Sequence, residues 1–154
     1  MECENGIIVN EIGQTSDHSI FAVGDCSNHP NNILKRRLRL ESVQNAVEQA
    51  KSIAASINGN HKPYHEVPWF WSDQYNIKLQ IAGISQHHDQ YAVRGFPEKE
   101  KFSVFYLKDS RLIAIDAINS PREFIVGKKL IARQSEVPLE LISNMDLDLK
   151  KIVG

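Results

Sequence analysis

The first side chain that could take part in chemistry is Asp25, because its carboxylate directly follows a short apolar run. Residues 20–23 read Ile-Phe-Ala-Val, and Gly24 separates them from the acid. Such a run is typical of a buried strand in a parallel sheet, and glycine permits a tight turn where the strand stops. Open α/β sheets bind ligands at the carboxyl ends of strands, where a carboxylate accepts hydrogen bonds from hydroxyl groups. A strand-end aspartate also serves as a helix cap or turn former, and the residues alone favour that simpler role.

The histidines and cysteines do not form a metal or redox motif. His61 and His65 have the spacing of helical metal ligands, but Pro63 lies between them and breaks a helix. Cys3 and Cys26 are too far apart for a Cys-x-x-Cys motif. We therefore predict no metal site, no general base or nucleophile among the histidines, and two reduced thiols.

A helix over residues 43–57 must position whatever binds near Asp25. Ser42 is its predicted N-cap, and Asn58-Gly59 ends it. Free N–H groups and the positive dipole end at its start can stabilise negative charge. The apolar stripe along the helix is predicted to face the core, and it comprises Val43, Ala46, Val47, Ala50, Ile53, Ala54 and Ile57.

A basic cluster precedes this helix in the sequence. It consists of Lys35, Arg36, Arg37 and Arg39. One interpretation is a solvated face, and the other is a docking patch for an acidic partner, since clustered charge steers encounter. Residues 26–32 before it, rich in Asn, His and Pro, are predicted to be a loop.

The second half of the chain predicts an α+β module. Three aromatic residues stand in a row at positions 69–71, and they could close a core or cover a ligand. Period-2 alternation then predicts antiparallel strands, a turn at 108–110 makes a hairpin, and Ser120-Pro121 opens a helix. The predicted strands span 77–84, 90–94, 102–107 and 111–118, and the predicted helices span 121–133 and 139–144.

Composition excludes several classes of protein. The chain has 154 residues, a net charge of −1 and 42% hydrophobic residues, which is ordinary for a globular protein with about one core. Near-neutral charge gives no reason to expect nucleic-acid binding. No window is long and apolar enough to cross a membrane, and the polar start is no signal peptide. We therefore predict a cytoplasmic protein.

Two stretches resemble signatures of a known family. Thr15-Ser16 followed by residues 20–25 resembles the second flavin signature of the pyridine nucleotide-disulfide oxidoreductase superfamily. The run Pro-Trp-Phe-Trp-Ser-Asp-Gln-Tyr at 68–75 resembles a signature of its putidaredoxin reductase-like subgroup, the ferredoxin and rubredoxin reductases. The resemblance covers essentially the whole chain. It implies FAD as cofactor, NAD(P)H as electron donor and a ferredoxin or rubredoxin as partner.

The resemblance also assigns roles to residues. It implies that Asp25 bonds the ribityl and phosphate part of FAD, that the backbone of Glu41, Ser42 and Val43 contacts the flavin ring, and that Trp71 lies beside the flavin. The resemblance assigns the same position to Trp69 and Phe70 with less support. The basic residues expected to face an acidic partner are Lys35, Arg36, Arg37, Arg39 and Lys51.

The glycine turns on which the family binds its dinucleotides do not occur in this sequence. No Gly-x-Gly-x-x-Gly is present, since the eight glycines are scattered singly. We therefore expect the C-terminal part of a larger reductase, inactive alone, with residues 1–66 from the FAD-binding domain and 67–154 forming the C-terminal domain. Strands at 7–9 and 20–23 would lack neighbours, which suggests self-association. The alternative function is a non-catalytic module for dimerisation or partner docking.

Overall fold

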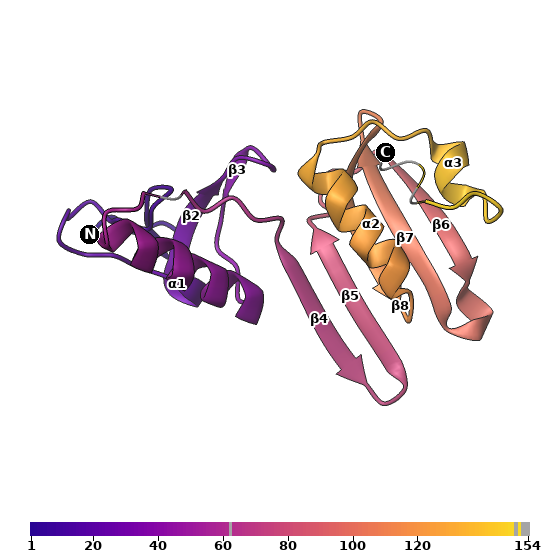
Figure 1. Cartoon of the computed structure of the whole chain (residues 1–154), viewed down its shortest axis with the longest axis horizontal. Helices are drawn as coiled ribbons and strands as arrows, with labels where there is room; N and C mark the ends of the chain where they lie inside the picture. The colour runs from indigo at the N-terminus through magenta and orange to yellow at the C-terminus, as the bar shows by residue number, and fades with distance from the viewer. Residues whose placement is uncertain (62, 150, 152–154) are drawn as a thin grey trace. The chain divides into compact units, whose positions relative to one another are not determined.

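The chain forms two compact units, Met1–Pro68 and Trp69–Gly154, and each is described by itself. The computed structural model describes residues 1–61, 63–149 and 151 (Figure 1). The second unit contains a five-stranded antiparallel sheet with helices, as the predicted α+β class requires. Within the described residues, no helix is long and apolar enough to cross a membrane.

The first unit is a small three-stranded sheet with one long helix. Strand β2 is central, pairing in parallel with β1 and antiparallel with β3. The predicted helix forms over the expected residues, with the Ser42 hydroxyl accepting a hydrogen bond from the Asn45 N–H at 3.2 Å. The elements are β1 (Ile7–Ile8), the 3₁₀ turn η1 (Gly24–Cys26), β2 (Ser27–Asn31), β3 (Arg36–Leu38) and α1 (Val43–Ile57).

One strand prediction and one loop prediction in this unit are wrong. Residues 20–23 make no buried strand, because their sole bridge in the described chain joins Phe21 to Gln14, and Ile20 and Val23 stay exposed. Residues 27–31, predicted as loop, form the central strand β2 instead. Apart from His29, their polar side chains are buried yet hydrogen-bonded: for example, the Asn31 amide donates to the Glu66 carbonyl at 3.1 Å. The polar composition of residues 27–31 therefore led to a loop prediction, although buried polar side chains with hydrogen-bond partners are compatible with a strand.

The predicted core stripe of α1 is also wrong. Val43, Val47 and Ile57 are exposed, and of the stripe only Ile53 is buried. The helix instead buries its polar face, which consists of Gln44, Asn45, Gln49, Ser52 and Ser56. This face packs against loops and turns whose backbone N–H and C=O groups need polar partners, as the site below shows. The expected self-association stays a prediction.

The second unit is a sheet in the order β4-β5-β8-β7-β6, with all pairs antiparallel. The hairpin between β7 and β8 forms as predicted, with Asp109 and Ser110 in the left-handed region at its turn. The strands are β4 (Trp69–Gln74), β5 (Ile77–Gly83), β6 (Gln90–Phe96), β7 (Lys101–Lys108) and β8 (Arg111–Ile118), followed by α2 (Pro121–Ala132) and α3 (Leu139–Ser143), with a short 3₁₀ turn η2 (Pro97–Lys99) between β6 and β7.

Helix α2 packs against β8 and β5 and closes the core of this unit (Figure 1). Phe105, Ile115 and Leu130 are fully buried. Gly127 lets α2 lie close to the sheet, because a Cβ there would be 2.9 Å from the Ile115 side chain. Ser120 is the N-cap residue and Pro121 begins the helix, as predicted, but the Ser120 hydroxyl donates to the Ile118 carbonyl at 2.8 Å and makes no side-chain capping bond.

Candidate functional site

The turn that carries Asp25 is fastened to helix α1. Gly24 adopts φ +75°, a conformation that favours glycine, and a Cβ there would lie 3.3 Å from the Ala46 Cβ. Its N–H donates to the Gln49 Oε1 at 2.7 Å. The Asp25 side chain is exposed, and no other described residue bonds its carboxylate. The turn thus presents an available hydrogen-bond acceptor beside the helix.

Arg39 joins Asp25 to Glu41. Its Nη1 donates to the Asp25 carbonyl at 3.2 Å and to the Glu41 Oε1 at 2.5 Å, while its Nε donates to the Asn5 Oδ1 at 3.1 Å. The structure therefore brings together Asp25 and the residue before the α1 cap. Because the Glu41 carboxylate is bonded to Arg39, a ligand at this place would meet the backbone of Glu41 rather than its side chain.

The N-terminus of α1 is the second part of the site in the first unit. An α-helix leaves its first N–H groups without partners inside the helix. Ser42 accepts from the Asn45 N–H, and the Asn45 side chain donates to the Leu40 carbonyl at 3.2 Å. The Val43 side chain is exposed. The positive end of the helix dipole therefore opens to the surface in the unit that carries Asp25.

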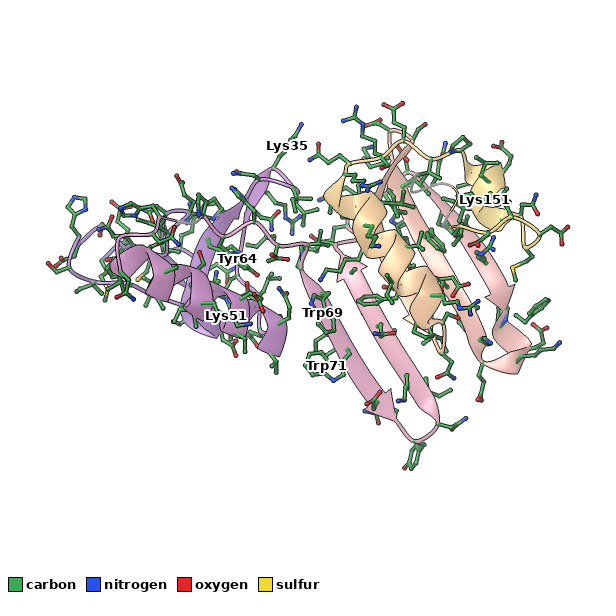
Figure 2. All side chains as sticks on the ribbon, in the orientation of Figure 1. Lys35, Lys51, Tyr64, Trp69, Trp71 and Lys151 are labelled. Carbon is green, nitrogen blue, oxygen red and sulfur yellow. The ribbon has the colours of Figure 1, made fainter. Side chains whose placement is uncertain are left out.

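Trp71 lies in the second unit, at the exposed end of an aromatic stack. Its ring centroid is 5.2 Å from that of Trp69, which lies 5.7 Å from that of Phe124. The Lys128 ammonium group is 5.4 Å from the Trp69 ring centroid. Both tryptophans project from β4 (Figure 2), whereas Phe70, the residue between them, points to the other face of the sheet. The stack fixes Trp71 while leaving its outer face accessible.

The basic residues predicted to dock a partner have different surroundings. The Arg37 guanidinium donates to the carbonyls of Val9 and Asn28, so it ties β3 to its neighbours. Arg39 is bonded as described above. Lys51 pairs with Glu48 at 2.8 Å on the exposed surface of α1 (Figure 2). The remaining two, Lys35 and Arg36, are exposed.

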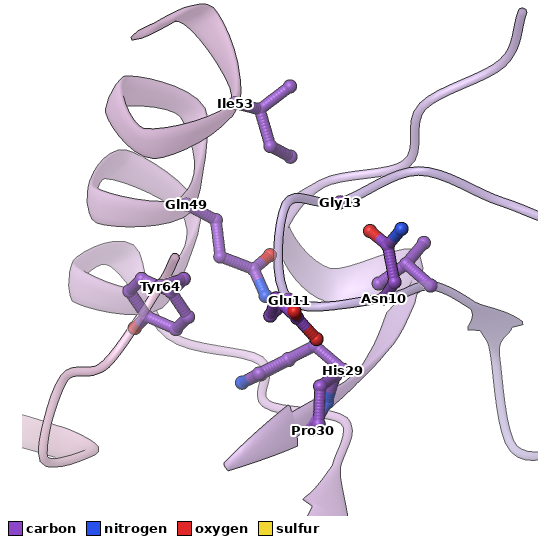
Figure 3. A pocket seen from close by; sticks show the side chains of 9 residues that line it. Asn10, Glu11, Gly13, His29, Pro30, Gln49, Ile53 and Tyr64 are labelled. Atoms are coloured by element: carbon purple, nitrogen blue, oxygen red, sulfur yellow. The ribbon is translucent and has the colours of Figure 1, made fainter. Parts of the chain in front are cut away.

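Sequence reasoning did not identify Gln49 or His29 as residues behind the site. Gln49 belongs to the buried polar face of α1, and a signal for it was available, since Asn45, Gln49, Ser52 and Ser56 recur at helical spacing. His29 lines a cavity of about 10 Å³ together with Gln49, Ile53 and Tyr64 (Figure 3). Its edge meets the Tyr64 ring, with centroids 5.3 Å apart.

Burial changes the acid–base properties around this cavity. Burial first, and then the charge of Arg37, lower the pKa of His29 to about 4. Burial raises the pKa of Tyr64 to about 12, although a hydrogen bond from Gln44 opposes the shift. Both rings are therefore neutral near pH 7. No cluster of three or more potential metal ligands occurs among the described residues.

Comparison with known proteins identifies the family. A family model described as "Reductase C-terminal" matches residues 69–153. The chain belongs to this family. A second model, "Pyridine nucleotide-disulphide oxidoreductase", matches residues 1–50. The resemblance deduced from the two signatures is thereby confirmed.

Relatives match the chain from end to end but are much longer. It is 42% identical to putidaredoxin reductase CamA of Pseudomonas putida over 154 residues, which is 100% of this chain and 36% of that protein. It is 41% identical to rhodocoxin reductase of Rhodococcus erythropolis, covering 98% of this chain and 35% of that one. The chain thus spans about a third of these reductases.

Solved structures show the same fold. The ferredoxin reductase for the CYP199A2 system from Rhodopseudomonas palustris matches with a TM-score of 0.94 and 38% identity, covering 99% of this chain and 38% of that one. The reductase in a covalent putidaredoxin reductase–putidaredoxin complex matches with a TM-score of 0.94 and 43% identity, over 99% of this chain and 36% of that one.

Proposed function

We propose that this chain is the C-terminal part of a flavoprotein reductase that passes electrons from NAD(P)H through FAD to a ferredoxin or rubredoxin. The observation that carries the proposal is the Asp25 turn, held beside the N-terminus of α1 with its carboxylate available. A carboxylate suits the hydroxyl groups of a ribityl chain, and a helix N-terminus suits the negative charge of a reduced flavin ring. The end-to-end similarity to reductases supports the same assignment.

Each predicted residue has a role in this proposal. Asp25 accepts hydrogen bonds from the ribityl chain, and the backbone of Glu41, Ser42 and Val43 faces the flavin ring. Trp71 covers the edge of the ring, supported by Trp69 beneath it. When bound, FAD supplies the redox chemistry, while these residues orient it and set the local charge.

Docking of an acidic iron–sulfur partner is proposed for the exposed cations. Lys35 and Arg36 are accessible, and Lys51 remains available because a surface ion pair such as that with Glu48 is weak. Arg37 and Arg39 stabilise the first unit through their bonds to its backbone, and they add positive charge to the same stretch. In the alternative function, docking is the whole role of the isolated chain.

The purified 154-residue chain is expected to be colourless and to oxidise no NADH. The reason is that its sequence contains no Gly-x-Gly-x-x-Gly turn for the ADP half of FAD or for NADH. Gel filtration of chain mixed with excess FAD, followed by an absorbance spectrum, measures this directly. A flavin band that elutes with the protein would contradict the expectation.

A chimera tests the proposed site. In it, this chain replaces the matching C-terminal part of Pseudomonas putida putidaredoxin reductase, to which it is 42% identical. We expect the chimera to retain FAD and to reduce a ferredoxin-type acceptor with NADH. Asp25→Ala is expected to weaken FAD binding by about tenfold or more, since a hydrogen bond to a charged group is worth about 1.5–3 kcal/mol.

The control for this chimera is Asp146→Ala. Asp146 is an exposed aspartate of the second unit, so it shares the residue type but not the turn. Its replacement is expected to leave FAD affinity unchanged. A chimera that folds and never binds FAD, or an Asp25 variant that binds FAD as tightly as the unmodified chimera, would refute the proposed site.

A further inference from the structure

The Asp25 turn depends on a single buried side-chain acceptor, and that acceptor belongs to Gln49. Gln49 is 3% exposed and lies on the polar face of α1. Its Oε1 accepts from the Gly24 N–H at 2.7 Å and from the Ser27 hydroxyl at 2.8 Å. Because the Gly24 N–H can only donate, the atom facing it must be the amide oxygen. The orientation of the Gln49 amide is thus determined by the turn that it contacts.

The two hydrogen bonds of Gln49 are made to residues on either side of Asp25, the residue proposed to bind flavin. Gly24 lies immediately before Asp25, and Ser27 follows the 3₁₀ turn as the first residue of β2. The single hydroxyl hydrogen of Ser27 is shared between the Gln49 Oε1 and the Gly24 carbonyl, which lies 2.9 Å away. Gln49 therefore connects both ends of the turn to α1, across 25 and 22 residues of sequence.

Gln49 also lines a small cavity. Figure 3 shows Gln49 and Ile53 projecting from α1 toward the segment with Asn10, Glu11 and Gly13. His29 lines the same cavity, and neither of its ring nitrogens has a hydrogen-bond partner among the described residues. Gly24 is itself buried, so loss of the Gln49 oxygen would leave its N–H without an acceptor.

We propose that Gln49 is a positioning residue, which holds the Gly24–Cys26 turn so that Asp25 is presented to the ribityl chain of a flavin. It acts through the turn and does not touch the ligand. The inference rests on the proposed function for its consequence, but the contact itself can be tested without any flavin.

The first experiment measures amide hydrogen exchange at Gly24 by NMR in the 154-residue chain. Gln49→Leu removes the acceptor, and we expect protection of the Gly24 amide to fall about tenfold or more while the amides of α1 keep theirs. Gln49→Glu keeps an acceptor oxygen and is expected to restore protection. The matched control is Gln44→Leu, another buried glutamine of α1, whose side chain bonds the Tyr64 hydroxyl at 3.3 Å. It should leave Gly24 unchanged.

Unchanged exchange at Gly24 in Gln49→Leu would overturn the proposal, as would an equal loss in the Gln44 control.

The second experiment uses the chimera of this chain with putidaredoxin reductase. Gln49→Leu should weaken FAD binding about tenfold, and adding it to Asp25→Ala should cause no further loss, because Gln49 acts through Asp25. If the exchange result holds while the chimera binds no FAD, Gln49 positions the turn and the proposed function is what fails.

Discussion

Replacing Arg94 by leucine is expected to destabilise the second unit by about 3–5 kcal/mol, the usual effect of removing one partner of a buried, hydrogen-bonded charge. Arg94 lies on β6 and is 6% exposed. Its guanidinium donates to the carbonyls of Ile142 at 3.1 Å and Leu147 at 2.7 Å, and also to that of Asn144. These bonds fasten the chain around α3 to the sheet, from 48 to 53 residues away.

Leucine would remove the donor that the carbonyls of Ile142 and Leu147 share, whereas the Asn144 carbonyl would keep the Leu147 N–H at 3.3 Å. It would also leave the Glu123 carboxylate, which lies 4.0 Å from the Arg94 Nε, without its ion-pair partner. Lysine is expected to recover only part of the loss, because a single ammonium group cannot reproduce the planar fork that reaches several carbonyls at once.

Urea unfolding followed by tryptophan fluorescence measures the effect, because both tryptophans, Trp69 and Trp71, belong to the second unit. The matched control is Arg111→Leu. Arg111 pairs with Glu136 at 3.2 Å, and both side chains are at least half exposed, so its loss should cost less than about 1 kcal/mol. If the two variants lose similar stability, Arg94 does not hold the segment around α3.

Regular patterns in the sequence were enough to predict most of the second unit and the helix of the first, although β4 was not among the predicted strands. Strand β8 and helix α1 occupy the predicted residues, 111–118 and 43–57, because alternation and capping are local signals. The hairpin between β7 and β8 follows for the same reason, since its turn residues lie next to the strands they join. Secondary structure was predictable where it depends on residues close together in the sequence.

The arrangement of the first unit was not predictable by the same means. Most polar residues of β2 and of the buried face of α1 form hydrogen bonds, and some of these reach far along the sequence, such as Asn31 to the Glu66 carbonyl and Gln49 to the Gly24 N–H. From the sequence, Arg39 was predicted to be one charge of a docking patch. In the structure it also joins Asp25 to Glu41 through hydrogen bonds. Such contacts depend on tertiary structure. Sequence periodicity therefore cannot predict which distant group a glutamine or arginine side chain will bond. Asp25 itself was recognised by resemblance to a family signature.

The first unit is expected to lose about 3 kcal/mol of stability between pH 6.5 and pH 4 because of one buried ring. His29 is 2% exposed, and both of its ring nitrogens lack hydrogen-bond partners among the described residues. Burial, followed by the positive charge of Arg37, lowers its pKa to about 4 from the ordinary value of 6.5. Glu11 also lines the cavity, but burial and Arg37 together still lower the pKa of His29 and so favour its neutral ring.

The direction of the effect follows from which state binds the proton. Above pH 6.5 the ring is neutral in both folded and unfolded chains, and stability is fully present. As pH falls from 6.5 to 4, the unfolded chain gains a proton that the folded chain does not, so stability falls by about 1.4 kcal/mol per pH unit. Below pH 4 the folded ring is protonated as well, and this contribution stops changing.

Substitution of His29 separates this effect from the titration of carboxylates at low pH. His29→Leu removes both unpartnered nitrogens, so we expect stability near pH 7 to change little and the loss between pH 6.5 and 4 to shrink by about 3 kcal/mol. His65→Gln, at an exposed histidine of the same unit, should keep the pH dependence of the unmodified chain. Urea unfolding followed through the NMR signals of β2 and α1 reports this unit alone, since both elements belong to it. A His29→Leu variant with undiminished pH dependence would show that the ring is protonated equally in the folded and unfolded chain.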